Sequence, residues 1–369
     1  MIIMWTAILI SFFFLDSVES LVPSWFGNSQ KIGTVSAGPL QISEMGCGTW
    51  SWGNRLLFDY DPSQDDELYD AYAKMRTAGI TLFDTADSYG TLDLNGRAEI
   101  LLGQFEKRFL EENEKDNNIF NNNNILEQQV ATKLAPYPWR LTRGSVVRAA
   151  RGSLERLEQD RVSIAQLHWS ASKYFPPQER ALWEGIGDVY DEGLCRAVGV
   201  SNYGPDQLQK VSTYFKERNV PLAVAQIQYS LMTYQTCRDM TDTCDDVGCR
   251  LLSYSPLCLG LLTGKYNADN LPKSGPRSQL FRELLPGAKD LLSTLEVISK
   301  DYDKSMAQVA INWALCKGTV PIPGARNVKM AEDNVDAATF RLKPDAVTEL
   351  DTAAAAVSKP MIQNIFQTE

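Results

Sequence analysis

The sequence predicts an α/β protein, a (β/α)8 barrel of the TIM type with a β-hairpin before its first strand. Eight short apolar segments alternate with segments of helical spacing over about 290 residues, which is the order and the count of such a barrel. A doubly wound sheet is the main rival, and it would carry a G-x-G-x-x-G fingerprint after its first strand. Gly46 and Gly48 are followed by Thr, Trp and Ser, so this fingerprint is absent.

The elements of this barrel can be assigned in order along the chain. Residues 30–43 alternate apolar and polar side chains around Ala37-Gly38-Pro39, which is typical of a short hairpin. We expect the eight strands at 45–48, 81–84, 129–133, 162–168, 196–201, 223–228, 250–254 and 319–321. We expect helices at 65–78, 97–108, 143–157, 178–191, 205–218, 235–247 and 327–337.

Several segments fall outside this alternation of strands and helices. Residues 1–20 form a signal-like leader, because their apolar run is shorter than the ~20 residues that cross a membrane comfortably. A retained anchor or a wrongly assigned start site is the alternative. The charged and then asparagine-rich segment 111–124 is expected to be disordered or a surface loop, and the Gly- and Pro-rich connection 257–286 could fold over a ligand. The barrel domain then spans 28–358, followed by a C-terminal tail at 359–369.

Composition argues against several classes of function. The formal net charge of −10 argues against nucleic acid or an anionic membrane surface as the main partner. The chain has one histidine, and its seven cysteines show no paired C-x-x-C spacing, so we predict no metal site. We expect the cysteines to be structural thiols, with a redox or disulfide role as the alternative.

Polar residues follow the second, third and fourth expected strands at the point where each strand ends. These residues are Asp84 and Tyr89, then Lys133, then His168. Because strand ends share one face of a parallel barrel, the four side chains should meet in one pocket. Each has an ordinary explanation when taken alone, such as a helix cap for Asp84 or a satisfied core histidine for His168. Their joint occurrence at matching strand ends favours a catalytic site.

Such a set suits the reduction of a carbonyl group. A free phenol, with a pKa of ~10, is a poor acid at neutral pH. The ammonium of Lys133 beside Tyr89 would lower that pKa, and Asp84 would keep the lysine charged and in place. His168 would orient the carbonyl group or help to relay the proton. We therefore predict Tyr89 as the general acid.

Seven motifs in the chain occur in the order in which the aldo-keto reductases carry them. They are FDTADSYG, ATKL, QLHWS, GVSNYG, QIQYSL, YSPLCLGLLTGKY and PIPGARNVKMAEDN. The chain thus resembles that family from about residue 31 to about residue 350. The WSWG near Trp50, the PWR at Trp139 and the SGPR before Ser278 most resemble the branch of plant and algal chloroplasts.

The resemblance implies an oxidoreductase of the carbonyl reductase or alcohol dehydrogenase type, with NADPH lying across the barrel mouth. Ser201, Asn202 and Gln226 resemble the residues that bind the carboxamide, and Tyr254 resembles the aromatic residue that stacks on the nicotinamide. The other implied cofactor residues are Thr49 and Trp50, then Ser255, Pro256, Leu257 and Gly260 at the pyrophosphate, and Gly324, Ala325, Arg326, Asp333 and Asn334 at the adenosine end. Met330 stands where this branch usually has Gln or Arg, which leaves the preference between NADPH and NADH open.

We expect Trp50, Trp52 and Trp169 to line a substrate pocket that suits an aldehyde with apolar or aromatic surface, ordinary packing being the alternative. The expected partner is a small-molecule carbonyl compound, with no stable membrane association once the leader is removed. Two other functions remain open: a nucleotide-sensing subunit resembling the potassium-channel β subunits, and a structural barrel without a cofactor. We expect a chloroplast location reached through the secretory-type leader, with the endoplasmic reticulum or secretion as the alternative. The sequence does not indicate an oligomeric state.

Overall fold

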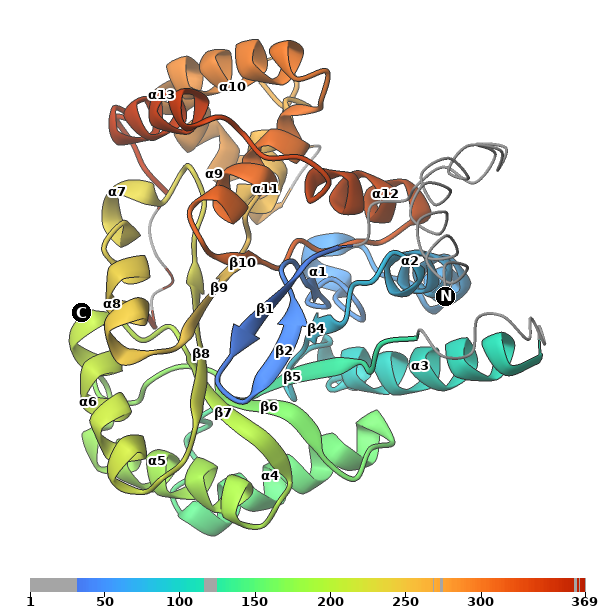
Figure 1. Ribbon diagram of the computed structural model, residues 1–369, viewed down its shortest axis with the longest axis vertical. Helices are drawn as coiled ribbons and strands as arrows, with labels where there is room; N and C mark the ends of the chain where they lie inside the picture. The colour runs from blue at the N-terminus through green and yellow to red at the C-terminus, as the bar shows by residue number, and fades with distance from the viewer. Residues whose placement is uncertain are drawn as a thin grey trace, which may run out of the picture. The chain divides into compact units, whose positions relative to one another are not determined.

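The computed structural model describes residues 32–115, 125–267, 269–272, 275–361, 364 and 366–368. The expected leader at 1–20 lies outside these residues, as does most of the asparagine-rich segment, 116–124. The described chain forms a barrel of strands surrounded by helices (Figure 1).

Eight parallel strands within the described residues form one sheet, in sequence order from β3 to β10. Hydrogen bonds from Gly46 N to Pro321 O (2.9 Å) and from Gly48 N to Pro323 O (3.2 Å) join the first strand to the last. The (β/α)8 prediction is therefore confirmed, and each expected strand is present. The strands are β3 Cys47–Gly48, β4 Leu82–Asp84, β5 Gln129–Leu134, β6 Val162–Leu167, β7 Cys195–Ser201, β8 Leu222–Gln228, β9 Arg250–Tyr254 and β10 Val320–Pro321.

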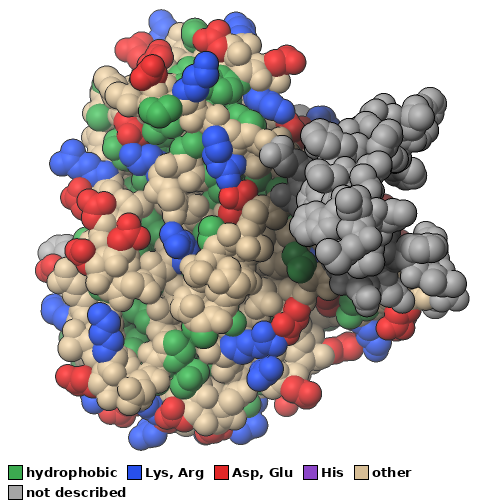
Figure 2. Space-filling model, in the orientation of Figure 1, with side chains coloured by type: hydrophobic (Ala, Val, Ile, Leu, Met, Phe, Trp, Pro, Cys, Tyr) green, Lys and Arg blue, Asp and Glu red, His purple; other side chains and the backbone are tan. Residues whose placement is uncertain are grey.

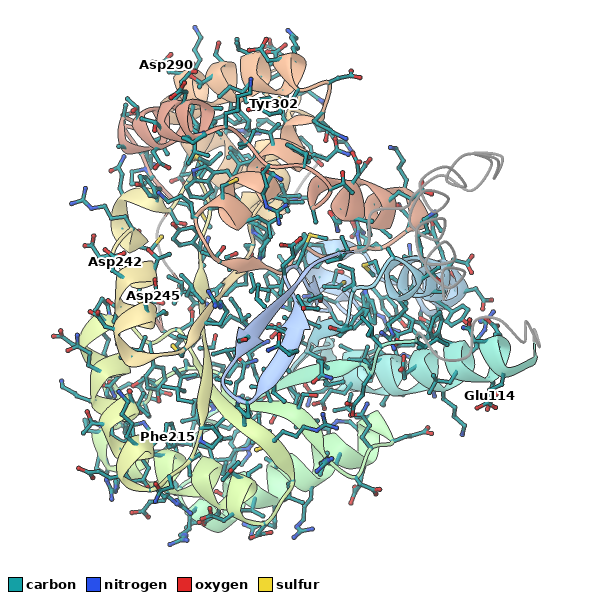
Figure 3. The ribbon with its side chains drawn as sticks, viewed as in Figure 1. Glu114, Phe215, Asp242, Asp245, Asp290 and Tyr302 are labelled. Carbon is teal, nitrogen blue, oxygen red and sulfur yellow. The ribbon has the colours of Figure 1, made fainter. Side chains whose placement is uncertain are left out.

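The helices pack around the outside of the barrel. Phe215 of α6 is fully buried on the inner side of its helix (Figure 3). The α-helices are α1 Arg55–Phe58, α2 Asp65–Thr77, α3 Arg97–Lys115, α4 Arg143–Leu157, α5 Pro176–Asp191, α6 Pro205–Glu217, α7 Tyr234–Cys237, α8 Met240–Val247, α9 Pro276–Leu284, α10 Lys289–Asp301, α11 Met306–Cys316, α12 Val328–Ala337 and α13 Pro344–Ala355. Short 3₁₀ helices are η1 Pro62–Gln64, η2 Leu92–Leu94, η3 Cys258–Thr263 and η4 Leu285–Ala288.

Two expectations about the helices are wrong in detail. Helix α3 continues to Lys115, so the first part of the expected loop at 111–124 is helical. Glu and Lys favour helix, and Arg108 pairs with Glu112 one turn later at 2.9 Å, which explains the extension. The helix expected at 235–247 is divided into α7 and α8. The connection at 257–286, for which folding over a ligand stays a prediction, contains η3 and α9.

The N-terminal hairpin closes one end of the barrel. Strands β1 (Thr34–Ala37) and β2 (Leu40–Ser43) pair in antiparallel fashion, as expected from the sequence. Arg250, the first residue of β9, donates from Nε to Ser36 O (3.4 Å), and Gly38 lies against Ala223 near the start of β8. Because the hairpin occupies the amino-terminal ends of the strands, their carboxyl ends are left for a functional site (Figure 1).

The surface carries mixed charge. On the face shown in Figure 2, Lys and Arg side chains are interspersed with Asp and Glu rather than gathered by sign. None of the described helices combines the length and the hydropathy that crossing a bilayer requires.

We predict that Gly90→Ala strongly destabilises the fold, because Gly90 has φ +130° and a Cβ there would lie 1.7 Å from the carbonyl oxygen of Leu94. The expected loss in the free energy of unfolding is about 4 kcal/mol or more. Gly193→Ala is the matched control, since Gly193 also has a positive φ (+73°) but has nothing within 4 Å of the position that a Cβ would take, so about 1–2 kcal/mol is expected. Urea denaturation measures both, and equal losses would contradict the steric argument.

Candidate active site

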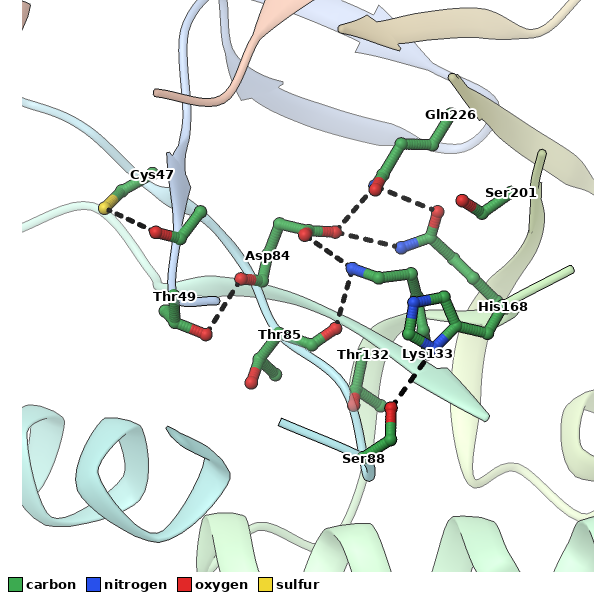
Figure 4. A network of polar contacts seen from close by, with 12 residues as sticks. Cys47, Thr49, Asp84, Thr85, Ser88, Thr132, Lys133, His168, Ser201 and Gln226 are labelled. Carbon is green, nitrogen blue, oxygen red and sulfur yellow. Dashed lines mark hydrogen bonds and ion pairs between the residues drawn. The ribbon is translucent and has the colours of Figure 1, made fainter. Parts of the chain in front are cut away.

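A buried ion pair lies at the carboxyl ends of two neighbouring strands. Asp84 is the last residue of β4, and Lys133 lies near the end of β5. Lys133 Nζ lies 2.5 Å from Asp84 Oδ2 and also donates to the carbonyl oxygen of Thr85 at 2.9 Å (Figure 4). The two side chains are only 1% and 3% exposed, so both charges are removed from water.

The second carboxylate oxygen of Asp84 is also satisfied. Asp84 Oδ1 accepts hydrogen bonds from Gln226 Nε2 of β8 (2.7 Å) and from Gln166 Nε2 of β6 (3.2 Å). A buried ion pair is tolerated only when such additional hydrogen bonds compensate the lost hydration. Side chains from β5, β6 and β8 therefore converge on the one carboxylate of β4 in the barrel interior.

The structure brings Tyr89 and His168 to this pair. Tyr89 is half-buried in the turn after β4, and Lys133 Nζ lies 4.9 Å from the centroid of its ring. The ring centroids of Tyr89 and His168 are 5.7 Å apart in an edge-to-face arrangement. All four predicted catalytic residues thus lie at one end of the barrel.

The pKa of the Tyr89 phenol shifts in the direction opposite to the one expected. Burial raises this pKa well above its usual range, and the carboxylate of Asp84 raises it further. Burial and Asp84 thus outweigh the lowering that the sequence predicts from the Lys133 ammonium. Burial is the main cause, and the carboxylate of Asp84, 2.5 Å from Lys133 Nζ, compensates the charge of the ammonium beside the phenol. Tyr89 is protonated at neutral pH, which is the state that a general acid requires.

The pKa values of Lys133 and His168 are both lowered. For Lys133 burial is the main cause, and the neighbouring Asp84 opposes it. Burial also lowers the pKa of His168 well below its usual range, and the positive charges of Lys133 and Arg140 lower it further. The neutral imidazole has its Nδ1 3.3 Å from the hydroxyl oxygen of Ser88, a contact that the sequence did not indicate.

The residues expected at the nicotinamide surround the same end of the barrel. Asn202 Nδ2 donates to the carbonyl oxygen of His168 (3.0 Å) and its Oδ1 accepts from the hydroxyl of Tyr254 (2.9 Å). The Asn202 amide nitrogen also lies 3.2 Å from Ser201 Oγ. Gln226, expected to bind the carboxamide, directs its amide nitrogen to Asp84 instead.

The turn after β9 has unusual backbone geometry. Ser255, Cys258 and Leu259 have positive φ angles of 51°, 48° and 56°, and Gly260 follows with φ 97°. Non-glycine residues rarely adopt this conformation, and clusters of such residues are found at functional sites. Pro256 and Leu257 lie within this turn, which was expected to contact the pyrophosphate.

The residues expected at the adenosine end gather around the start of α12. The side chain of Asn327 caps this helix by accepting from Met330 N at 2.9 Å. Arg326 Nη1 donates to the carbonyl oxygen of Phe58 (2.9 Å), and Asn334 Nδ2 donates to that of Gly324 (3.3 Å).

Two more of the residues expected to contact the cofactor have protein partners. Asp333 pairs with Lys329 at 2.8 Å, one turn away on α12. Thr49 is fully buried and donates through both its backbone nitrogen (2.9 Å) and its hydroxyl (3.0 Å) to the carbonyl oxygen of Asp84.

One of the three expected pocket tryptophans is placed elsewhere. Trp52 is 0% exposed, packs against Phe105 and donates to the carbonyl oxygen of Ala325, so it belongs to the core and the pocket prediction is wrong for it. Trp50 is 37% exposed. Trp169 follows His168 directly, with ring centroids 4.9 Å apart.

The C-terminal tail reaches this end of the barrel, which the sequence did not indicate. The ring of Phe366 stacks on Trp169 with centroids 4.5 Å apart and an interplanar angle of 15°. Thr368 N donates to the carbonyl oxygen of Asn202 at 3.2 Å. Lys173 Nζ donates to the carbonyl oxygen of Gln367 at 2.7 Å. The short tail has no apolar period that could have revealed these contacts.

The chain is similar to a known family of enzymes over most of its length. Residues 44–355 match the family model of the aldo/keto reductases. The chain is 52% identical over 335 residues to the chloroplastic pyridoxal reductase of Arabidopsis thaliana, covering 90% of this chain and 89% of the relative. It is 25% identical over 336 residues to the NADH-specific methylglyoxal reductase of Escherichia coli, covering 87% and 97%.

Solved structures show the same fold. A glycerol dehydrogenase of Gluconobacter oxydans superposes with a TM-score of 0.70 at 24% identity, covering 92% of this chain and all of the other. An aldo-keto reductase of Bombyx mori in complex with NADP superposes with a TM-score of 0.63 at 20% identity, covering 88% and 93%.

We predict that His168 stays neutral well below the pH at which a free imidazole titrates. Because it is the one histidine of the chain, its NMR signals are assigned without ambiguity. The midpoint in the folded protein should lie well below that of the urea-unfolded chain, which is about 6.5. Below about pH 6.5 the imidazole is protonated in the unfolded chain but not in the folded chain. This residue therefore lowers the free energy of unfolding as the pH falls. A folded midpoint near 6.5 would contradict the burial of the imidazole.

Proposed function

This chain is a member of the aldo/keto reductase family, and on that basis we propose that it reduces aldehydes or ketones to alcohols with NADPH as the hydride donor. The observation that carries the proposal is the meeting of Tyr89, Lys133 and His168 around a buried carboxylate at the carboxyl end of the barrel. These are the groups that hold and deliver one proton beside a carbonyl oxygen.

Each catalytic residue has a distinct part in this proposal. Tyr89, protonated at neutral pH, donates its hydroxyl proton to the substrate oxygen as hydride reaches the carbonyl carbon. Negative charge leaves the substrate oxygen and develops on the phenolate. The Lys133 ammonium then stabilises that charge, and Asp84 keeps the ammonium in place. Neutral His168 orients the carbonyl group by hydrogen bonding.

The residues present fit a nicotinamide dinucleotide. When bound, such a cofactor supplies the hydride. Asn202 and Ser201 offer amide and hydroxyl groups for a carboxamide, and the ring of Tyr254 offers a stacking surface beside them. At the other end, Arg326 precedes the start of α12, where a guanidinium and helix amides favour a phosphate. Met330 adds no polar group there, and the Escherichia coli relative is named as NADH-specific, so both nucleotides belong in the assay.

We propose an aromatic aldehyde of the pyridoxal type as the substrate. The Arabidopsis relative is named a pyridoxal reductase and is 52% identical to this chain over 335 residues, which are 90% of this chain. The stacked rings of Trp169 and Phe366 beside His168 provide flat apolar surface suited to such a ring. By the same relationship we propose a chloroplast location, for which the leader at 1–20 would supply the targeting.

We predict that Tyr89→Phe lowers the rate of aldehyde reduction by about 10²- to 10⁴-fold, because the proton donor is lost while the ring remains. NADPH affinity, measured by quenching of protein fluorescence, should stay within a few-fold of the wild type. Pyridoxal and an aliphatic aldehyde are assayed with NADPH and with NADH.

Two outcomes would contradict parts of this proposal. Near-normal turnover by the Tyr89→Phe variant would show that the acid is a different group. Tight nucleotide binding by the wild type, with negligible turnover across all aldehydes, would instead favour the nucleotide-sensing role.

A further inference from the structure

The turn that carries Tyr89 is held by a second buried carboxylate. Asp87 lies between Asp84 and Tyr89 and is 4% exposed. Its backbone nitrogen donates to the carbonyl oxygen of Lys133 at 2.9 Å. Its Oδ1 accepts from the backbone nitrogen of Ala135 at 3.2 Å. The turn is thus fixed to the end of β5 by both main-chain and side-chain contacts.

Arg140 completes this attachment from the loop between β5 and α4. Its Nη1 lies 2.5 Å from Asp87 Oδ2 and donates to the carbonyl oxygen of Ala135 at 2.7 Å. The guanidinium therefore bridges the turn after β4 and the segment after β5. Only 15% of the Arg140 side chain is exposed, so this pair is largely shielded from water.

The loop that carries Arg140 is itself anchored to α5. Gln178 Nε2 donates to the carbonyl oxygens of Tyr137 (2.9 Å) and Arg140 (3.0 Å). The guanidinium of Arg140 also lies 4.9 Å from the centroid of the Tyr137 ring. A rigid connection therefore runs from α5 through Gln178, Arg140 and Asp87 to the residue two positions before Tyr89.

The same turn contacts the imidazole. Ser88 follows Asp87 directly, and its hydroxyl oxygen lies 3.3 Å from His168 Nδ1. Placement of Asp87 therefore sets the positions of two groups, the Tyr89 phenol and the His168 partner.

We propose that Arg140, through its buried ion pair with Asp87, is a positioning residue that holds the Tyr89 phenol and the Ser88–His168 contact in place for proton donation. The proposal rests on the proposed function, in which Tyr89 is the acid. Removal of Arg140 leaves a buried carboxylate without its cation, and Asp87 then moves and shifts the turn that carries Tyr89. A displacement of about 1 Å at a reacting group is enough to cost about 10²-fold in rate.

Kinetics provide the first test. Arg140→Gln and Asp87→Asn should each lower kcat for aldehyde reduction by about 10- to 100-fold, with the Kd for NADPH within about threefold of the wild type. Arg143→Gln is the matched control, because Arg143 lies three residues on, is exposed, and pairs with Asp188 on α5. Arg140→Lys, which keeps the charge but not the size and planar shape of the guanidinium, should recover only part of kcat. Unchanged kcat in both Arg140→Gln and Asp87→Asn overturns the proposal.

The pKa of His168 distinguishes a positioning role of Arg140 from a general disruption of the site, and it is measured without any assay of activity. The charged and titratable groups around the imidazole are Tyr89, Lys133 with its partner Asp84, and Arg140. Asp87 is connected to the imidazole through the next residue, Ser88, whose hydroxyl oxygen lies 3.3 Å from His168 Nδ1. Arg140→Gln removes a positive charge and should raise the pKa of His168. Asp87→Asn removes a negative charge while keeping the shape of the side chain, and should lower it.

A general disruption of the site would change the pKa of His168 in a different way. Entry of water would raise the pKa of His168 in both variants, since burial is the main cause of its depression. Opposite shifts together with reduced kcat support the proposal, and upward shifts in both variants overturn it. A failed proposed function would appear instead as normal turnover by Tyr89→Phe, while these pKa shifts would persist.

Discussion

The buried ion pair between Lys133 and Asp84 is the constraint on which the rest of the site depends. Two opposite charges inside a barrel are costly unless every polar atom around them is satisfied. Gln166, Gln226 and the carbonyl oxygen of Thr85 supply those partners. Strands β4, β5, β6 and β8 must therefore keep their register for the pair to persist, which links the barrel closure directly to the chemistry.

Under the proposed function, the pair also accounts for how Lys133 can assist the Tyr89 phenol without deprotonating it before the reaction. In the structure the carboxylate compensates the ammonium, and burial keeps the Tyr89 pKa high. In the proposed reaction, charge separation becomes favourable only when a substrate oxygen takes the proton and the phenolate forms beside Lys133, whose Nζ lies 4.9 Å from the centroid of the ring. Stabilisation that appears with the developing charge lowers the barrier, whereas stabilisation already present in the resting enzyme does not.

The barrel and the grouping of the candidate site residues could be predicted from the sequence because both follow from strand ends. Apolar runs mark the strands, and parallel strands place their terminal polar residues on one face, so Asp84, Lys133 and His168 could be grouped without coordinates. The direction of the Tyr89 pKa could not be predicted, because it depends on the distance between Lys133 and Asp84 and on burial. The neighbours of Trp52 in sequence indicate a pocket position, although its ring lies in the core.

Other features depend on contacts between distant segments. The stacking of Phe366 on Trp169 joins residues almost two hundred positions apart in a tail without periodicity. Arg140 and Asp87 are ordinary charged residues in sequence, and only their burial and mutual distance of 2.5 Å distinguish them. Helix α3 extends into a segment expected to be a loop, because favourable pairs such as Arg108 with Glu112 outweigh its lack of apolar residues.

A double-mutant cycle on Asp84→Asn and Lys133→Met tests the central claim most directly, with the rate of hydride transfer in a single turnover as the measurement. If Asp84 acts only by holding the Lys133 ammonium, the double variant is no slower than the Lys133→Met variant alone. If the two losses multiply, each residue acts independently on the reaction, and the account of a single ion pair that controls the phenol is contradicted.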